Sequence, residues 1–76
     1  HDLVSVTVIH PSAMLADAWA TALTGLGFDD AMVVAQVQGL AVYFIQRDGD
    51  SLRYRHTAEF SPYLVVQQQQ GEGARE

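Results

Sequence analysis

Asp17 and Thr21 are the two side chains in this sequence whose types and spacing best suit chemistry. They stand four residues apart in the alanine-rich stretch 16–22, so in a helix their oxygen atoms share one face. At roughly 100° per residue, Thr24 falls in the same stripe. A carboxylate and a hydroxyl on a face of small residues suit a hard cation such as Mg²⁺. The same spacing is also common on ordinary solvated helices, so the spacing alone leaves both interpretations open.

The elements that would position this pair begin with a strand. Residues 3–9 alternate Val with Ser and Thr, which predicts a half-buried strand. Ser12 is the expected N-cap of a helix over residues 13–24, which Gly25 and Gly27 should end. The apolar side of this helix should pack against the sheet, and its residues are Leu15, Trp19, Leu23 and Leu26.

A second, shorter helix and a hairpin are expected next. Asp29 or Asp30 should cap the helix, which should end near residue 38. The apolar run 40–45 predicts a strand covered on both faces. Asp48-Gly49 predicts a tight turn into a strand over residues 51–56. A last short strand is expected from Tyr63 to Val66, followed by a disordered polar tail over 67–76. The fold class is therefore α+β, with an antiparallel sheet.

Size and composition limit the function classes. With 76 residues, the chain is one small domain or part of one, and because it starts at His1 without a Met we interpret it as a fragment. The net charge is −5, Lys is absent and four Arg are present, which argues against a nucleic-acid partner. The lack of Cys excludes disulfide bonds and thiolate sites. No apolar run approaches the ~20 residues needed to cross a bilayer.

Three short motifs together resemble a known family. They are S-V-T-V at residues 5–8, P-S-A-M at 11–14 and A-D-A-x-x-T-A at 16–22, and G-L-A-V-Y follows at 39–43. Each motif alone is weak, but the combination closely resembles the C-terminal part of the FAD:protein FMN transferases, the ApbE family, once called thiamine-biosynthesis lipoproteins. The resemblance covers about residues 2–66. It implies that residues 1–66 are a C-terminal fragment of a larger α+β flavin transferase domain.

The resemblance also implies a role for the helix pair. In the family, the acid and the Thr of this motif help to hold the Mg²⁺ that bridges the pyrophosphate of FAD, which assigns Asp17 and Thr21 as metal ligands. The implied parent enzyme moves the FMN part of FAD onto a Thr or Ser hydroxyl of an acceptor protein and releases AMP. Family acceptors include subunits of membrane redox complexes, and some members hydrolyse FAD instead. The implied location is the periplasmic face of the bacterial inner membrane, with a lipid anchor.

The family's catalytic and flavin-binding segments are not recognisable in these residues. Its H-x-x-D-P-x-T-G segment has no counterpart here, so no catalytic residue is assigned and the flavin-binding residues stay unknown. We therefore expect the 76-residue chain alone to be inactive, and its exposed strand edges favour self-association. The alternative function is a non-catalytic α+β interaction module that docks through the alanine-rich helix. An upstream H-x-x-D-P-x-T-G segment would decide between the two.

The remaining polar residues have more ordinary interpretations. No metal-ligand spacing relates the histidines, which are His1, His10 and His56. His10, just before the first helix, is expected to be exposed. The acids on both sides of Gly49 favour a hairpin over a calcium loop, because the twelve-residue pattern ending in Glu is missing. Arg53 and Arg55 share a strand face and are expected to be exposed or to pair with acids of the missing part.

Overall fold

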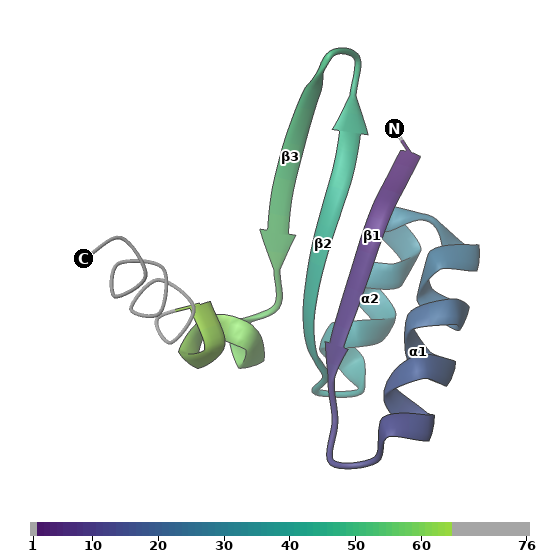
Figure 1. The fold of residues 1–76 in the computed structure, drawn as a ribbon, viewed down its shortest axis with the longest axis vertical. Coiled ribbons are helices and arrows are strands. Elements are labelled where there is room, and N and C mark those ends of the chain that lie inside the picture. The colour runs from purple at the N-terminus through teal and green to yellow at the C-terminus, as the bar shows by residue number, and fades with distance from the viewer. Residues whose placement is uncertain (1, 65–76) are drawn as a thin grey trace.

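The protein is an α+β unit with a three-stranded antiparallel sheet, as the sequence predicts (Figure 1). The computed structural model describes residues 2–64. Its elements are the strand β1 (Asp2–Ile9), the helices α1 (Ala13–Leu26) and α2 (Phe28–Val37), the strands β2 (Ala41–Asp48) and β3 (Ser51–His56), and the 3-10 helix η1 (Ala58–Phe60). None of the helices within 2–64 has the length and apolar character required to span a membrane.

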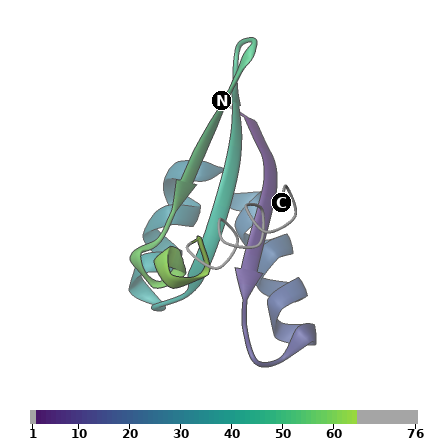
Figure 2. The ribbon, with the colours of Figure 1, turned by 60° about the vertical axis from the view of Figure 1, so that its left-hand side comes forward.

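Both helices cover the same face of the sheet, whose strand order is β1-β2-β3 (Figures 1 and 2). Antiparallel pairing places Val8 opposite Val42 and Val6 opposite Phe44. Between this face and the helices lies the core, formed by the buried side chains of Val8, Leu23, Ala31, Ala35, Val42 and Phe44. Phe28, at the start of α2, meets Phe44 edge-on with 5.3 Å between the ring centroids.

The boundaries of α1 and α2 depend on Ser12 and Gly27. Ser12 is the N-cap of α1, and its Oγ accepts a hydrogen bond from the Leu15 amide at 3.2 Å, as predicted. The helix runs through Gly25 and ends at Gly27, whose φ of 83° is unfavourable for residues with a side chain. The prediction that Asp29 or Asp30 caps α2 is wrong. Gly27 is the N-cap, and both acids lie in the first turn, where their charge favours the helix dipole.

The β2–β3 hairpin forms where Asp48-Gly49 predicted it. Asp48 pairs with Ser51, and Gly49 has a φ of 65°, as the first central residue of a type II′ turn requires. The expectation that the apolar run is covered on both faces is wrong for the described residues. Alternate residues of β2 are buried under the helices, whereas Tyr43 and Ile45 on the opposite face are only half-buried.

The prediction of a strand from Tyr63 to Val66 is also wrong in its described part, because residues 61–64 are helical. The apolar residues suggested a strand, but Pro62 lies in the first turn of this helix, where a missing amide hydrogen costs nothing.

Thr57 redirects the chain after β3 and is 1% exposed. Its amide donates to Val42 O at 3.0 Å. Residues 65–66 and the expected tail, 67–76, lie outside the described residues.

Candidate metal-binding face of α1

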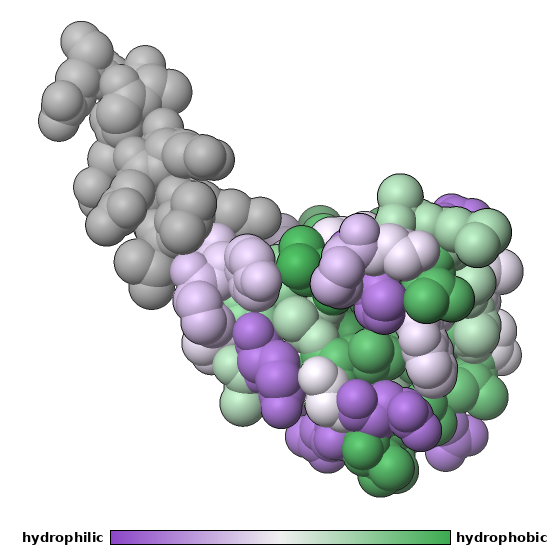
Figure 3. Space-filling model, turned by 90° about the horizontal axis from the view of Figure 1, so that it is seen from below, coloured by the Kyte–Doolittle hydropathy of each residue, from purple (hydrophilic) through white to green (hydrophobic). Residues whose placement is uncertain are grey.

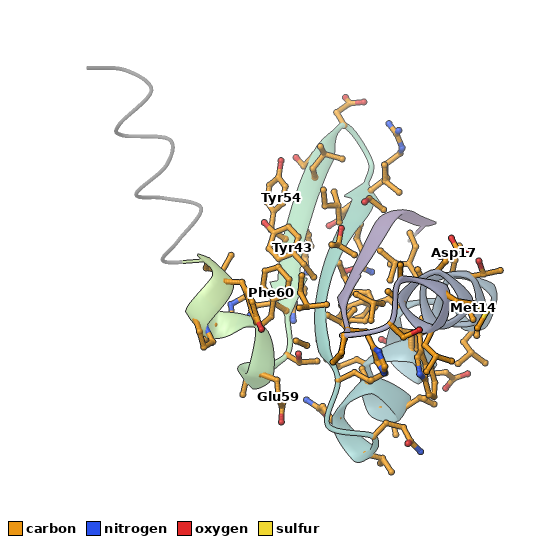
Figure 4. The ribbon with its side chains drawn as sticks, turned by 60° about the horizontal axis from the view of Figure 1, so that its bottom comes forward. Met14, Asp17, Tyr43, Tyr54, Glu59 and Phe60 are labelled. Carbon is orange, nitrogen blue, oxygen red and sulfur yellow. The ribbon has the colours of Figure 1, made fainter. Side chains whose placement is uncertain are left out.

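Asp17 and Thr21 lie on an exposed face of α1, as predicted. Figure 4 shows Asp17 on the helix, near Met14 and remote from the tyrosines of the hairpin. The core-facing side of α1 consists of Leu23, which is fully buried, and of three half-buried residues, Ala16, Trp19 and Ala20. The polar pair therefore faces away from the core, where another part of a protein or a ligand can approach it.

The predicted orientation of α1 is only partly right. Leu23 is buried and Trp19 packs against the core, but Leu15 is 45% exposed and Leu26 is 46% exposed. The helix is rotated so that Ala16 and Ala20, rather than these two leucines, face the sheet and α2. Small side chains permit the close approach of neighbouring backbones, and this selects the alanines for the contact.

The hydroxyl of Thr21 is held by the helix itself. Its Oγ1 donates to the backbone oxygen of Asp17 at 3.0 Å, and Thr24 Oγ1 donates in the same way to Ala20 O at 2.7 Å. This bond uses the only hydroxyl hydrogen of Thr21, so the lone pairs of Oγ1 are what remains for a ligand. An oxygen in this state can accept from a donor or coordinate a cation.

The carboxylate of Asp17 completes a pair of oxygen donors that fits Mg²⁺. Within residues 2–64, no hydrogen bond or ion pair engages this carboxylate. Mg²⁺ is usually bound by one or two carboxylates together with phosphate oxygens and waters. A protein can therefore supply as few as two of its ligands, which is the number that this helix face offers. The same residues contain no cluster of three or more His, Cys, Asp or Glu side chains suited to a metal ion, and no pocket. A metal ion at this pair would need further ligands from a phosphate, from water or from beyond the described residues.

The other predicted polar residues serve local structure. His10 is half-buried rather than exposed, because its Nδ1 accepts a hydrogen bond from the Ser12 amide at 3.0 Å. Arg53 pairs with Asp48 across the hairpin, with 3.0 Å between Nε and Oδ2. Arg55 lies over the ring of Phe28, 5.7 Å from its centroid. Both arginines are exposed, as expected, and each also has a partner within the chain.

Sequence reasoning missed a cluster of aromatic rings on the sheet face opposite the helices. Tyr43 stacks on Tyr54 and on Phe60, with centroid distances of 6.3 and 5.2 Å. His56 is part of the same cluster, and its Nδ1 lies 2.8 Å from Thr57 O. The alternation of Tyr54 and His56 along β3 was the available signal, but their meeting with Phe60 depends on the turn at Thr57.

Comparison with known proteins identifies the class to which this fold and helix motif belong. A family model described as "ApbE family" matches residues 1–44. The FAD:protein FMN transferase of Escherichia coli K12 is 49% identical over 65 residues, which are 86% of this chain and 18% of that protein. The corresponding protein of Haemophilus influenzae is 40% identical over 60 residues, 79% of this chain and 17% of its own length.

A solved structure agrees with these sequence matches. The apo form of the Pseudomonas stutzeri flavinyl transferase ApbE superimposes with a TM-score of 0.78 at 35% identity, over 82% of this chain and 20% of that one. The chain thus spans less than a fifth of the length of the curated relatives named above. It belongs to the ApbE family, and the resemblance drawn from its motifs is confirmed.

Proposed function

We propose that the full-length gene product carrying these residues transfers FMN from FAD to a Thr or Ser hydroxyl of an acceptor protein. The acceptor oxygen forms a phosphoester bond with the FMN phosphorus. The phosphoanhydride bond to AMP breaks, AMP leaves, and the hydroxyl proton passes to solvent. The names of the relatives, FAD:protein FMN transferase, support the reaction class. The observation that carries the proposal is the exposed pair Asp17 and Thr21 on α1, within the segment where the family matches this chain.

Asp17 and Thr21 are proposed to hold a Mg²⁺ ion against the FAD pyrophosphate. Bound there, Mg²⁺ would neutralise charge that develops on the phosphate oxygens as the anhydride bond breaks. The Asp17 carboxylate contributes the charged ligand. Thr21 Oγ1 contributes a neutral oxygen whose hydrogen is already committed to Asp17 O, which keeps its lone pairs available. The remaining flavin-binding and catalytic residues are expected in other parts of the polypeptide.

The partner and the location are proposed from the family resemblance. The acceptor is a subunit of a membrane redox complex, and the enzyme works at the periplasmic face of the inner membrane with a lipid anchor. Fractionation of cells expressing the full-length gene, combined with labelling by a radioactive fatty acid, tests this location. Recovery of unlabelled protein in the cytoplasmic fraction would contradict it.

Asp17→Asn tests the metal assignment. In the full-length protein it should lower FMN transfer by about 100-fold or more at limiting Mg²⁺, because metal stabilisation of a phosphoryl transition state is worth several kcal/mol. Transfer is measured as flavin fluorescence of a redox-complex acceptor subunit after denaturing electrophoresis, and AMP is measured by chromatography. AMP with free FMN, without labelled acceptor, would indicate FAD hydrolysis instead.

Asp50→Asn is the matched control, because Asp50 is an exposed acid at the hairpin turn and its change removes the same charge. It should behave as wild type. If Asp17→Asn also retains wild-type transfer at limiting Mg²⁺, Asp17 is not a ligand and the site assignment is wrong.

A further inference from the structure

His10 connects β1 to α1 through a bond that neither the family match nor the proposed reaction assigns. Ser12 N donates to His10 Nδ1 at 3.0 Å, and Ser12 in turn begins the helix. Its Oγ accepts from Leu15 N at 3.2 Å, and its carbonyl oxygen accepts from Ala16 N at 2.9 Å. Ser12 thus takes part in three hydrogen bonds, and in one of them its amide donates to an imidazole nitrogen.

The direction of this bond fixes the protonation of His10. A backbone amide can only donate, so Nδ1 must present its lone pair, and in the neutral ring the hydrogen lies on Nε2. A proton on Nδ1 would place two donors against each other and break the bond. Pro11 has no amide hydrogen, so the Ser12 amide is the first backbone donor that follows His10.

Few ionisable side chains lie on the elements next to His10, and those of the helices α1 and α2 are Asp17, Asp29 and Asp30, all exposed. Among residues 3–16, which comprise most of β1, the turn and the start of α1, His10 has the only ionisable side chain. Residues 31–46, which comprise most of α2 and of β2, contain only Tyr43 as an ionisable side chain. Within these two segments, His10 is thus the side chain whose protonation can alter the hydrogen bond at the Ser12 amide.

We propose that His10 is a positioning residue that, while its Nδ1 is unprotonated, holds the first turn of α1 and so orients the face with Asp17 and Thr21. Acidification breaks the His10–Ser12 bond and frees the start of the helix, so that the paired oxygens bind Mg²⁺ less well. This inference rests on the proposed function, because only that function gives the two oxygens their metal. It concerns a connection within the chain, so part of it is testable without any metal.

Two variants separate the hydrogen bond from the titration. In Asn, Oδ1 is as many bonds from the backbone as Nδ1 is in His, so His10→Asn keeps an acceptor for the amide two residues ahead. Asn does not titrate in this range. His10→Ala removes both the acceptor and the titration. His56→Asn is the matched control, since it removes an imidazole at the end of β3 rather than at the start of α1.

The first measurement uses the full-length protein labelled with ¹⁵N at Ser and His, without Mg²⁺ or FAD. At neutral pH the spectrum should show His10 with its hydrogen on Nε2 and a Ser12 amide protected from exchange. Protection should be lost in wild type on acidification and at every pH in His10→Ala. It should persist across the range in His10→Asn. A hydrogen on Nδ1, or a Ser12 amide that is unaffected in His10→Ala, would overturn the proposal.

The second measurement is the Mg²⁺ concentration that gives half-maximal FMN transfer, from pH 5.5 to 8. At neutral pH, His10→Ala should need about fivefold more Mg²⁺ than wild type, which corresponds to the loss of one hydrogen bond. His10→Asn should match wild type at neutral pH and need less Mg²⁺ than wild type at pH 5.5. His56→Asn should follow the wild-type profile. Equal profiles for wild type, His10→Ala and His10→Asn would refute the positioning role.

A failure of the proposed function would look different. In that case Asp17→Asn would leave the Mg²⁺ requirement unchanged. The exchange protection of the Ser12 amide would still show whether His10 holds the start of α1. Where His10→Ala does not fold, the comparison of His10→Asn with wild type at pH 5.5 alone decides the second measurement.

Discussion

On one face of the sheet, α1 and α2 bury Val42 and Phe44 completely, whereas on the other face Tyr43 is half-buried and Tyr54 is 57% exposed. Both faces belong to the same strands, so the difference comes from what covers them. The helix side is a core of aliphatic residues and Phe44, against which Trp19 and Phe28 pack. The other side is ordered by aromatic rings that stack on one another, where η1 supplies Phe60 (Figure 4).

The candidate metal ligands and the aromatic cluster lie on opposite sides of the sheet. The candidate metal ligands lie on the outer side of the helix layer, and the hairpin rings lie beyond the opposite face of the sheet. Apolar residues reach the surface among hydrophilic ones in the described part (Figure 3), and the exposed ones include Met14, Val33 and Val37. We therefore expect a substitution on the helix side of the sheet to lower the free energy of unfolding more than one on the aromatic face.

Phe44→Ala should have the largest effect on stability. Phe44 is fully buried and contacts Phe28, so its truncation should lower the free energy of unfolding by about 3–5 kcal/mol through lost burial and a cavity. Phe44→Leu, which keeps most of the volume, should lose much less. Urea unfolding of the full-length protein, followed by circular dichroism, measures both. A loss below about 1 kcal/mol for Phe44→Ala would mean that the helix side is not the better-packed face.

Local signals were enough to predict the start of α1 and the turn of the hairpin. Ser12 caps α1 through its own side chain, and the turn at Gly49 depends on a backbone angle that only a few residues adopt easily. Such features depend on neighbours within four residues, so they can be recognised in sequence. The position of Asp17 and Thr21 on one exposed helix face follows from the same short-range periodicity.

The wrong predictions concern contacts between distant residues. Leu15 has the polarity of a core residue, but the alanines at 31 and 35 in α2 let the helices approach with Ala16 and Ala20 inward. Polarity along the helix could not reveal this choice of partner. The helical residues 61–64 were misread for a similar reason, because an apolar pattern over so few residues does not separate helix from strand.

Thr57→Val should have an intermediate effect and tests the connection from the hairpin to η1. The buried Oγ1 accepts from Val42 N at 3.0 Å and donates to Leu40 O at 2.7 Å. Val has nearly the same shape but leaves both backbone groups without this partner, which should cost about 2–3 kcal/mol. Thr57→Ser retains the hydroxyl and should lose less than about 1 kcal/mol. Equal losses for Val and Ser, measured by urea unfolding, would assign the role of Thr57 to its methyl group.

Tyr54→Ala should have the smallest effect on unfolding. The ring is largely exposed and stacks on Tyr43, so its removal should cost only about 0.5–1.5 kcal/mol. Tyr54→Ala should have a larger effect on the self-association of the isolated 76-residue chain. We expect this chain to self-associate, because β1 and β3 are the edges of the sheet and Tyr54, an outer ring of the cluster opposite the helices, is 57% exposed.

Light scattering of the isolated chain across a concentration series measures this association, and Tyr54→Ala should shift it toward the monomer. Val33→Ser is the matched control, since it removes an exposed apolar side chain from α2 on the other side of the sheet. If the wild-type chain is monomeric at every concentration, the prediction of self-association is wrong. If Val33→Ser reduces association more than Tyr54→Ala, the helix layer rather than the aromatic face forms the contact.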